Sequence, residues 1–201
     1  GSNFLGTNRD DVFDSSDIEI KYTFYVHYEN NSFWGSAWNE YYYLGISYYQ
    51  IEKYNRAKES LERYLKFNNE NGEAHYYLGS AYFSQNKIDL SITAYQKAIT
   101  LNPNHAQAYN NLGLAYVKQN KISEAIKSYQ ESISADPNFF AAYFNLGKTY
   151  CLIHEFGLAI NVFKQALHLK PNDYSTYNHL GITYSRNGQT QKAIEAHHKS
   201  I

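Results

Sequence analysis

Several features that define common protein classes are scarce in this 201-residue chain. It has one cysteine, Cys151, and no methionine. A single cysteine excludes an internal disulfide framework and fits a reducing compartment, so we expect a cytoplasmic protein, with export left open. No run of about 18 apolar residues is present, which argues against insertion into a membrane. The net charge of −1 argues against a nucleic-acid partner, because generic polyanion binders are strongly basic.

Proline is also rare, but its three copies are regularly placed. Pro103, Pro137 and Pro171 are separated by 34 residues each. Leu-Gly dipeptides begin at positions 44, 78, 112, 146 and 180, which is the same interval. Because the interval holds without an insertion or deletion, the sequence predicts one structural unit repeated five times. The units are 38–71, 72–105, 106–139, 140–173 and 174–201, and the fifth is shorter than the others.

Each unit carries the pattern of two amphipathic helices. Numbered from the first residue of a unit, apolar or aromatic residues recur at positions 4, 7, 8 and 11, and again at 17, 20, 21, 24 and 28. This is helical spacing. Between the two sets, position 15 holds Glu52, Asn86, Asn120, His154 and Gly188. Asn, His and Gly tolerate a left-handed backbone, so we expect a tight helix–helix turn there.

Small residues mark the predicted contacts between the two helices of a unit. Position 8 is always glycine, and position 20 is alanine or serine. Glycine inside a helix costs about 1 kcal/mol relative to alanine, so its recurrence indicates a packing requirement. We expect the two backbones to touch at this point.

The pattern resembles the tetratricopeptide repeat. The signature of that repeat is a large residue, Leu-Gly, tyrosine, a small residue, an aromatic residue, another small residue and proline. In the third unit these are Tyr109, Leu112, Gly113, Tyr116, Ala125, Tyr129, Ser132 and Pro137. The first unit departs most, with Tyr64 at a small position and Asn69 in place of proline. The resemblance covers residues 38–201 and implies an all-α fold, a right-handed α-solenoid of antiparallel helix pairs. It also implies a non-catalytic scaffold for protein–protein interaction.

In such repeats the first helices line a concave groove that binds an extended peptide segment of a partner. Carried over by resemblance, the groove positions give an aromatic end and an amide-rich end with three cations. The candidate contacts are Tyr42, Tyr43, Tyr76, Tyr77, Asn110, Asn111, Lys118, Phe144, Asn145, Lys148, Asn178 and Arg186. Tyr42 and Tyr76 are expected to be the exposed members of their pairs. Asn111 and Asn145 resemble two rungs of the asparagine ladder in repeats like those of O-GlcNAc transferase.

Catalytic and metal-binding patterns are not found. The sequence has no HExxH, GxSxG, Walker A or GxGxxG motif, so we expect no enzyme activity and no cofactor. Cys151 and His154 are three residues apart, but His154 occupies the turn position and no second pair accompanies them. His197 and His198 point about 100° apart on a helix, and His197 occupies the packing position 24. The Lys-x-x-x-Asn pair of the carboxylate-clamp subclass is missing, which disfavours a chaperone tail as the ligand.

The ends of the chain leave alternatives open. Residues 1–37 precede the repeats. We predict that 1–16 are mobile and that a helix over 17–30 caps the first unit, whereas the alternation over 18–28 favours an extended segment instead. At the other end, Ala193, Ile194 and Ile201 are expected to meet water. Two further functions follow as alternatives: a substrate-recruiting arm of a larger enzyme such as a glycosyltransferase, and self-association through this face or through 18–28.

Overall fold

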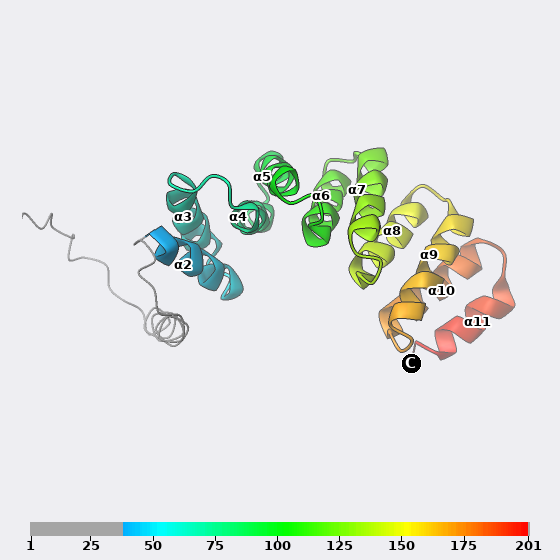
Figure 1. Ribbon diagram of the computed structural model, residues 1–201. Coiled ribbons are helices and arrows are strands. Elements are labelled where there is room, and N and C mark those ends of the chain that lie inside the picture. The colour runs from blue at the N-terminus through cyan, green and yellow to red at the C-terminus, as the bar shows by residue number, and fades with distance from the viewer. Residues whose placement is uncertain (1–37, 201) are drawn as a thin grey trace, which may run out of the picture.

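The regular secondary structure of the described residues is helical throughout. The computed structural model describes residues 38–200, so the predictions for residues 1–37 and Ile201 fall outside the described residues. Ten helices follow one another in an elongated array (Figure 1). The first helices of the units are α2 (Trp38–Gln50), α4 (Gly72–Ser84), α6 (Ala106–Lys118), α8 (Phe140–Leu152) and α10 (Tyr174–Arg186). The second helices are α3 (Tyr54–Leu65), α5 (Ile88–Leu101), α7 (Ile122–Ala135), α9 (Phe156–Leu169) and α11 (Thr190–His198).

Packing follows the order of the chain. Each first helix packs on the second helix of its own unit, and each second helix packs on the first helix of the next unit. Long-range order therefore arises from contacts between neighbours, as in other repeat proteins. The predicted all-α superhelix of antiparallel helix pairs is confirmed.

The turn inside each unit adopts the left-handed backbone that the sequence predicts. The φ angles are 61° at Glu52, 59° at Asn86, 60° at Asn120, 62° at His154 and 74° at Gly188. In each unit, the residue after this one donates a backbone hydrogen bond to the carbonyl at position 11, as Lys121 does to Tyr116 at 2.9 Å. The bond closes the end of the first helix and reverses the chain into the second.

Two first helices begin with a side-chain cap. Asn71 accepts a hydrogen bond from the backbone N–H of Ala74 at 3.0 Å, and Asp173 accepts one from Thr176 at 2.8 Å. Each bond satisfies a donor that the first turn of a helix leaves unpaired. The caps fix where α4 and α10 begin.

The recurring glycine makes room for a side chain, not for a second backbone. A Cβ added to Gly113 would lie 2.6 Å from Cε1 of Tyr129, and one added to Gly147 would lie 2.6 Å from Cε1 of Phe163. The expected contact between two backbones is therefore corrected. The residue at position 24 lies directly against the glycine of the same unit, and at Gly181 the ring of His197 does so.

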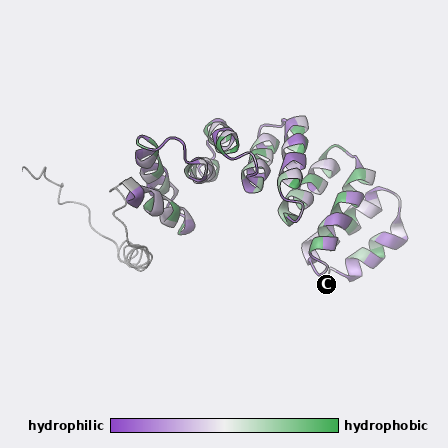
Figure 2. Ribbon diagram, viewed as in Figure 1, coloured by the Kyte–Doolittle hydropathy of each residue, from purple (hydrophilic) through white to green (hydrophobic). Residues whose placement is uncertain are grey.

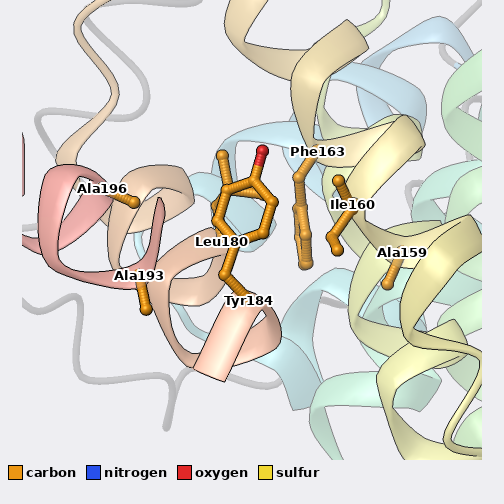
Figure 3. Close-up of a cluster of buried hydrophobic side chains, with 7 residues drawn as sticks. All are labelled: Ala159, Ile160, Phe163, Leu180, Tyr184, Ala193 and Ala196. Atoms are coloured by element: carbon orange, nitrogen blue, oxygen red, sulfur yellow. The ribbon is translucent and has the colours of Figure 1, made fainter. Parts of the chain in front are cut away.

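The apolar core runs along the array between the helices. Figure 2 shows that hydrophobic and hydrophilic residues share most of the helices, as amphipathic helices require. In the last units, residues from α9, α10 and α11 meet in one cluster (Figure 3): Ala159, Ile160, Phe163, Leu180, Tyr184, Ala193 and Ala196. Ala193 is 5% exposed because Leu180 and Tyr184 cover it, so its predicted exposure is wrong. Ile194 is 48% exposed, as expected.

Candidate functional site

The first helices form the inner face of the array. Successive first helices touch one another, α2 with α4, α4 with α6, α6 with α8 and α8 with α10. Within the part of the chain that the structure describes, successive second helices make no such contact. An array whose first helices lie closer together than its second helices must curve toward the first helices. The first helices, which carry the predicted groove residues, therefore line the concave side.

Two neighbouring positions build a continuous stripe along this side. Position 6 of one unit meets position 5 of the unit before it. Asn111 Nδ2 donates to Tyr76 Oη at 3.5 Å, and Asn145 Nδ2 donates to Asn110 Oδ1 at 2.9 Å. One unit later, the rings of His179 and Phe144 lie edge to face, with centroids 5.2 Å apart. All three pairs are 35 residues apart, so each contact joins the same two positions of neighbouring units.

The amide part of the stripe is linked within the chain as well. Asn110 Nδ2 donates to Asn111 Oδ1 at 3.1 Å, which joins the two pairs of amide contacts into one chain from Tyr76 to Asn145. Asn110 is 4% exposed because its amide lies between its two neighbours. Little of Asn110 is therefore accessible to a partner, and its side chain instead hydrogen-bonds the other two amides. Asn111 and Asn145 are partly exposed, as a contact requires.

The aromatic end of the groove consists of tyrosine pairs. The rings of Tyr42 and Tyr43 lie 5.2 Å apart, and so do those of Tyr76 and Tyr77. Tyr43 is 43% exposed, whereas Tyr42 is half-buried against Tyr64 at 5.2 Å. The prediction that Tyr42 is the exposed member of its pair is thus wrong. Tyr42 instead packs between the rings of Tyr43 and Tyr64.

Burial changes the acidity of the tyrosine hydroxyls. It raises the pKa of Tyr76 to about 12, with the neighbouring Tyr49 and Tyr77 adding to the effect. It also raises the pKa of Tyr42, and the carboxylate of Glu73 contributes next. Both hydroxyls therefore stay protonated at neutral pH and remain able to donate hydrogen bonds.

Charged groups divide the groove into two halves. At the aromatic end, Glu73 Oε2 lies 3.2 Å from His105 Nε2, in a geometry that is electrostatic contact and not a hydrogen bond. At the other end, Lys148 lies over the ring of Phe144, with Nζ 5.4 Å from the centroid. Lys118, Asn178 and Arg186 are exposed on the first helices, where the sequence predicts them.

A cavity of about 280 Å³, here named the basic pocket, lies between α8 and α10. Its lining residues are Lys148, Cys151, Leu152, His179, Ile182, Thr183 and Arg186. Cys151 Sγ lies 3.2 Å from Thr183 Oγ1, which joins the two walls of the pocket. Sequence reasoning identified the two cations but missed Cys151, Leu152, Ile182 and Thr183 as groove residues. Cys151 and Leu152 stand at positions 12 and 13 of their unit and Ile182 at position 9, which are groove positions by resemblance, whereas position 10 of Thr183 gave no such signal.

Other chemistry that the sequence raised is placed elsewhere. His154 lies in its turn with its ring 5.6 Å from that of Phe156, apart from the Cys151 contact with Thr183. Among residues 38–200, no three His, Cys, Asp or Glu side chains are grouped so that they could hold a metal ion. No described helix is long and apolar enough to cross a bilayer.

Comparison with known proteins identifies the repeat. Family models described as TPR repeat match residues 79–120 and 113–152, and models described as tetratricopeptide repeat match 41–67 and 162–195. The chain belongs to the tetratricopeptide repeat family. Members of this family are generally non-catalytic interaction modules, and this array is a scaffold for protein–protein interaction. No curated protein matches the chain significantly.

Solved structures of MamA proteins share the fold. A crystal structure of a MamA protein is 24% identical, covers 81% of this chain and 89% of its own, and has a TM-score of 0.74. MamA residues 41 to the end from Desulfovibrio magneticus RS-1 are 22% identical, with coverages of 83% and 94% and a TM-score of 0.75. MamA from MSR-1 is 26% identical, with coverages of 81% and 94% and a TM-score of 0.68. At this identity the likeness describes the fold.

Proposed function

We propose that the concave groove holds an extended segment of a partner protein. The observation that supports this proposal is the stripe of linked amides on the inner face. An extended peptide presents backbone N–H and C=O groups at regular intervals, and a carboxamide can both donate to and accept from them. Contact through the backbone would allow partners of different sequence.

The two partly exposed amides, Asn111 and Asn145, have bonding capacity left for a ligand. A carboxamide has two N–H donors and an oxygen with two lone pairs. Asn145 donates one hydrogen bond to Asn110, while Asn111 donates one to Tyr76 and accepts one from Asn110. These internal bonds hold both amides in fixed orientations before a partner arrives. Such preorganisation lowers the entropy cost of binding.

The aromatic end supplies contact area. Tyrosine is large and rigid and carries a polar tip, which makes it frequent at interaction hot spots. Tyr43 is 43% exposed and its edge-to-face contact with Tyr42 fixes its ring. In the proposed complex, the amides hold the backbone of the segment and the tyrosines hold its apolar side chains.

Selection of peptides and a matched pair of double variants test the proposal. A library of random 12-residue peptides displayed on phage is selected against the full chain, and the affinities of enriched peptides are measured by fluorescence anisotropy. We expect Asn111→Ala with Asn145→Ala to weaken binding about tenfold, since each lost hydrogen bond contributes roughly 0.5–1.5 kcal/mol. The control is Asn55→Ala with Asn161→Ala, two exposed asparagines on the second helices α3 and α9.

The affinities of the two double variants show whether the peptide binds at the amide stripe. Equal affinities for the wild type and the Asn111/Asn145 variant would place the peptide outside the amide stripe and contradict the proposal. A loss in the α3/α9 control of the same size would do so as well, because it would indicate binding on the outer face.

A further inference from the structure

The basic pocket between α8 and α10 lies in the part of the groove that carries Lys148 and Arg186. Its volume of about 280 Å³ is slightly below the range typical of complete small-molecule sites. The pocket therefore suits one or two side chains of a longer segment that continues along the groove.

Within residues 38–200, the two cations of the pocket have no carboxylate beside them. Lys148 and Arg186 line opposite walls, one on α8 and the other on α10, and both are exposed. Among the described residues, no carboxylate lies within ion-pair distance of either cation. The carboxylate of Glu73, which approaches His105, is at the other end of the groove. A pair of unmatched cations facing a shared cavity attracts an anion.

The positive charge of Lys148 also affects the histidine of the pocket. His179 lies on the α10 side, and burial is the main reason that its pKa is lowered below 6.5. The positive charge of Lys148 is the second reason. Lys148 therefore acts on groups inside the pocket as well as on solvent.

The pocket is also apolar in part. Leu152 and Ile182 are exposed to 59% and 37% and line it from α8 and α10. An isolated inorganic anion would leave this apolar surface in contact with water. A carboxylate with apolar atoms beside it would use both the cations and the apolar surface.

We propose that the basic pocket binds an aspartate or glutamate side chain of the partner segment, with an adjacent apolar side chain on Leu152 and Ile182. This inference rests on the proposed function, because it describes one part of the segment that the groove holds. The pocket is built differently from the carboxylate clamp. In the first three units of this chain, the clamp's lysine and asparagine positions hold Tyr42 and Ile46, Tyr76 and Ser80, and Asn110 and Leu114.

Charge reversal combined with peptide selection tests the inference. The same phage library is selected in parallel against the wild-type chain and against Lys148→Glu with Arg186→Glu. The control, Lys121→Glu with Lys127→Glu, makes the same change in net charge at two exposed lysines of the α6–α7 turn and α7. Circular dichroism and thermal melting establish that all three proteins are folded.

The expected result is a change in the selected sequences. Wild type and control should enrich peptides with an acidic residue beside an apolar one, and the charge-reversed protein should enrich a basic residue at that place. A wild-type peptide should lose about tenfold or more in affinity for the charge-reversed protein, and little for the control. The wild-type affinity should also fall when salt is raised from 50 to 300 mM.

The outcomes separate this inference from the proposed function. Enriched peptides that need Asn111 and Asn145 but show no acidic preference would overturn the inference and leave the groove proposal intact. Absence of any peptide that needs the two asparagines would overturn the groove proposal itself. A synthetic wild-type peptide is finally compared as C-terminal amide and free acid. Binding that requires the free acid would show that a terminal carboxylate, and not a side chain, occupies the pocket.

Discussion

Asn145 in α8 donates a hydrogen bond from Nδ2 to Oδ1 of Asn110 in α6, over a distance of 2.9 Å. The two residues are 35 positions apart, one more than the repeat length, so the bond links position 6 of one unit to position 5 of the unit before. The same offset links Asn111 to Tyr76. Side chains of neighbouring units therefore support one another on the inner face.

The Asn110–Asn145 bond predicts an energetic coupling between two units. Asn110→Ala leaves Asn145 without its internal partner, so we expect it to destabilise the chain by about 1–3 kcal/mol. A double-mutant cycle with Asn145→Ala should give a coupling of about 0.5–1.5 kcal/mol, measured by urea denaturation. Asn55→Ala serves as the control partner, and its effect should add to that of Asn110→Ala. Full additivity of the Asn110 and Asn145 substitutions would contradict the bond.

Replacing glycine with alanine should have opposite effects at Gly113, which is at position 8 of its unit, and at Gly157, which is not. Gly113→Ala should lower the melting temperature despite the higher helix propensity of alanine, because Tyr129 is fully buried and cannot move away from the new Cβ. A net loss of about 1–3 kcal/mol is expected. Gly157→Ala in α9 is the control, since no atom lies within 4 Å of its added Cβ. It should stabilise the chain by up to about 1 kcal/mol, and the reverse order of the two would refute the packing argument.

Replacing Glu52 with glycine should stabilise the turn between α2 and α3. Its φ of 61° is left-handed, which costs most L-residues about 1–2 kcal/mol. Glu52→Gly should therefore raise the melting temperature, because glycine adopts this backbone freely. Glu59→Gly, an exposed site inside α3, should lower it by the equivalent of about 1 kcal/mol. A loss at both positions would show that the strain at Glu52 is insignificant.

The lowered pKa values of two histidines should make the stability of the fold depend on pH. Burial is the main cause of the lowered pKa values of His75 and His179. At His75, the hydrogen bond that the ring donates to the backbone carbonyl of Asn69 partly opposes this effect on the pKa. Each imidazole binds its proton more weakly in the folded chain than in the unfolded chain. The contribution to stability is therefore complete above the unfolded pKa of about 6.5 and is lost as the pH falls through the lower folded values.

Chemical denaturation at pH 7.5, 6.5 and 5.5 measures this loss. The double variant His75→Gln with His179→Asn should show a smaller decrease over the same range. Lys148→Ala should raise the pKa of His179 in an NMR titration without restoring 6.5, because burial remains. An unchanged His179 pKa in that variant would contradict the electrostatic contact.

Much of the fold could be read from the residues of a single unit. The turn at position 15 follows from residues that tolerate a positive φ, and the structure has that φ at Asn86 and Asn120. The glycine at position 8 was correctly identified as a packing site. Its partner was not, because the pattern shows where space is needed and not which atoms fill it.

The candidate site was less predictable. Position in the repeat identified the inner face, but it did not show that Asn110 is buried or that Tyr43 is more exposed than Tyr42. Those properties depend on how closely one unit approaches the next. A pattern confined to 34 residues carries little information about that distance.

The sequence by itself determined the period, the two helices of each unit and the turn between them, because helical spacing and backbone preference are local properties. The tertiary structure alone decided which side chains meet between units. The angle between successive units brings Asn145 to Asn110 and closes the basic pocket with Lys148 and Arg186, which are 38 residues apart. That angle results from the packing of buried side chains such as Tyr129 and Phe163 against their neighbours, which depends on all of these side chains together.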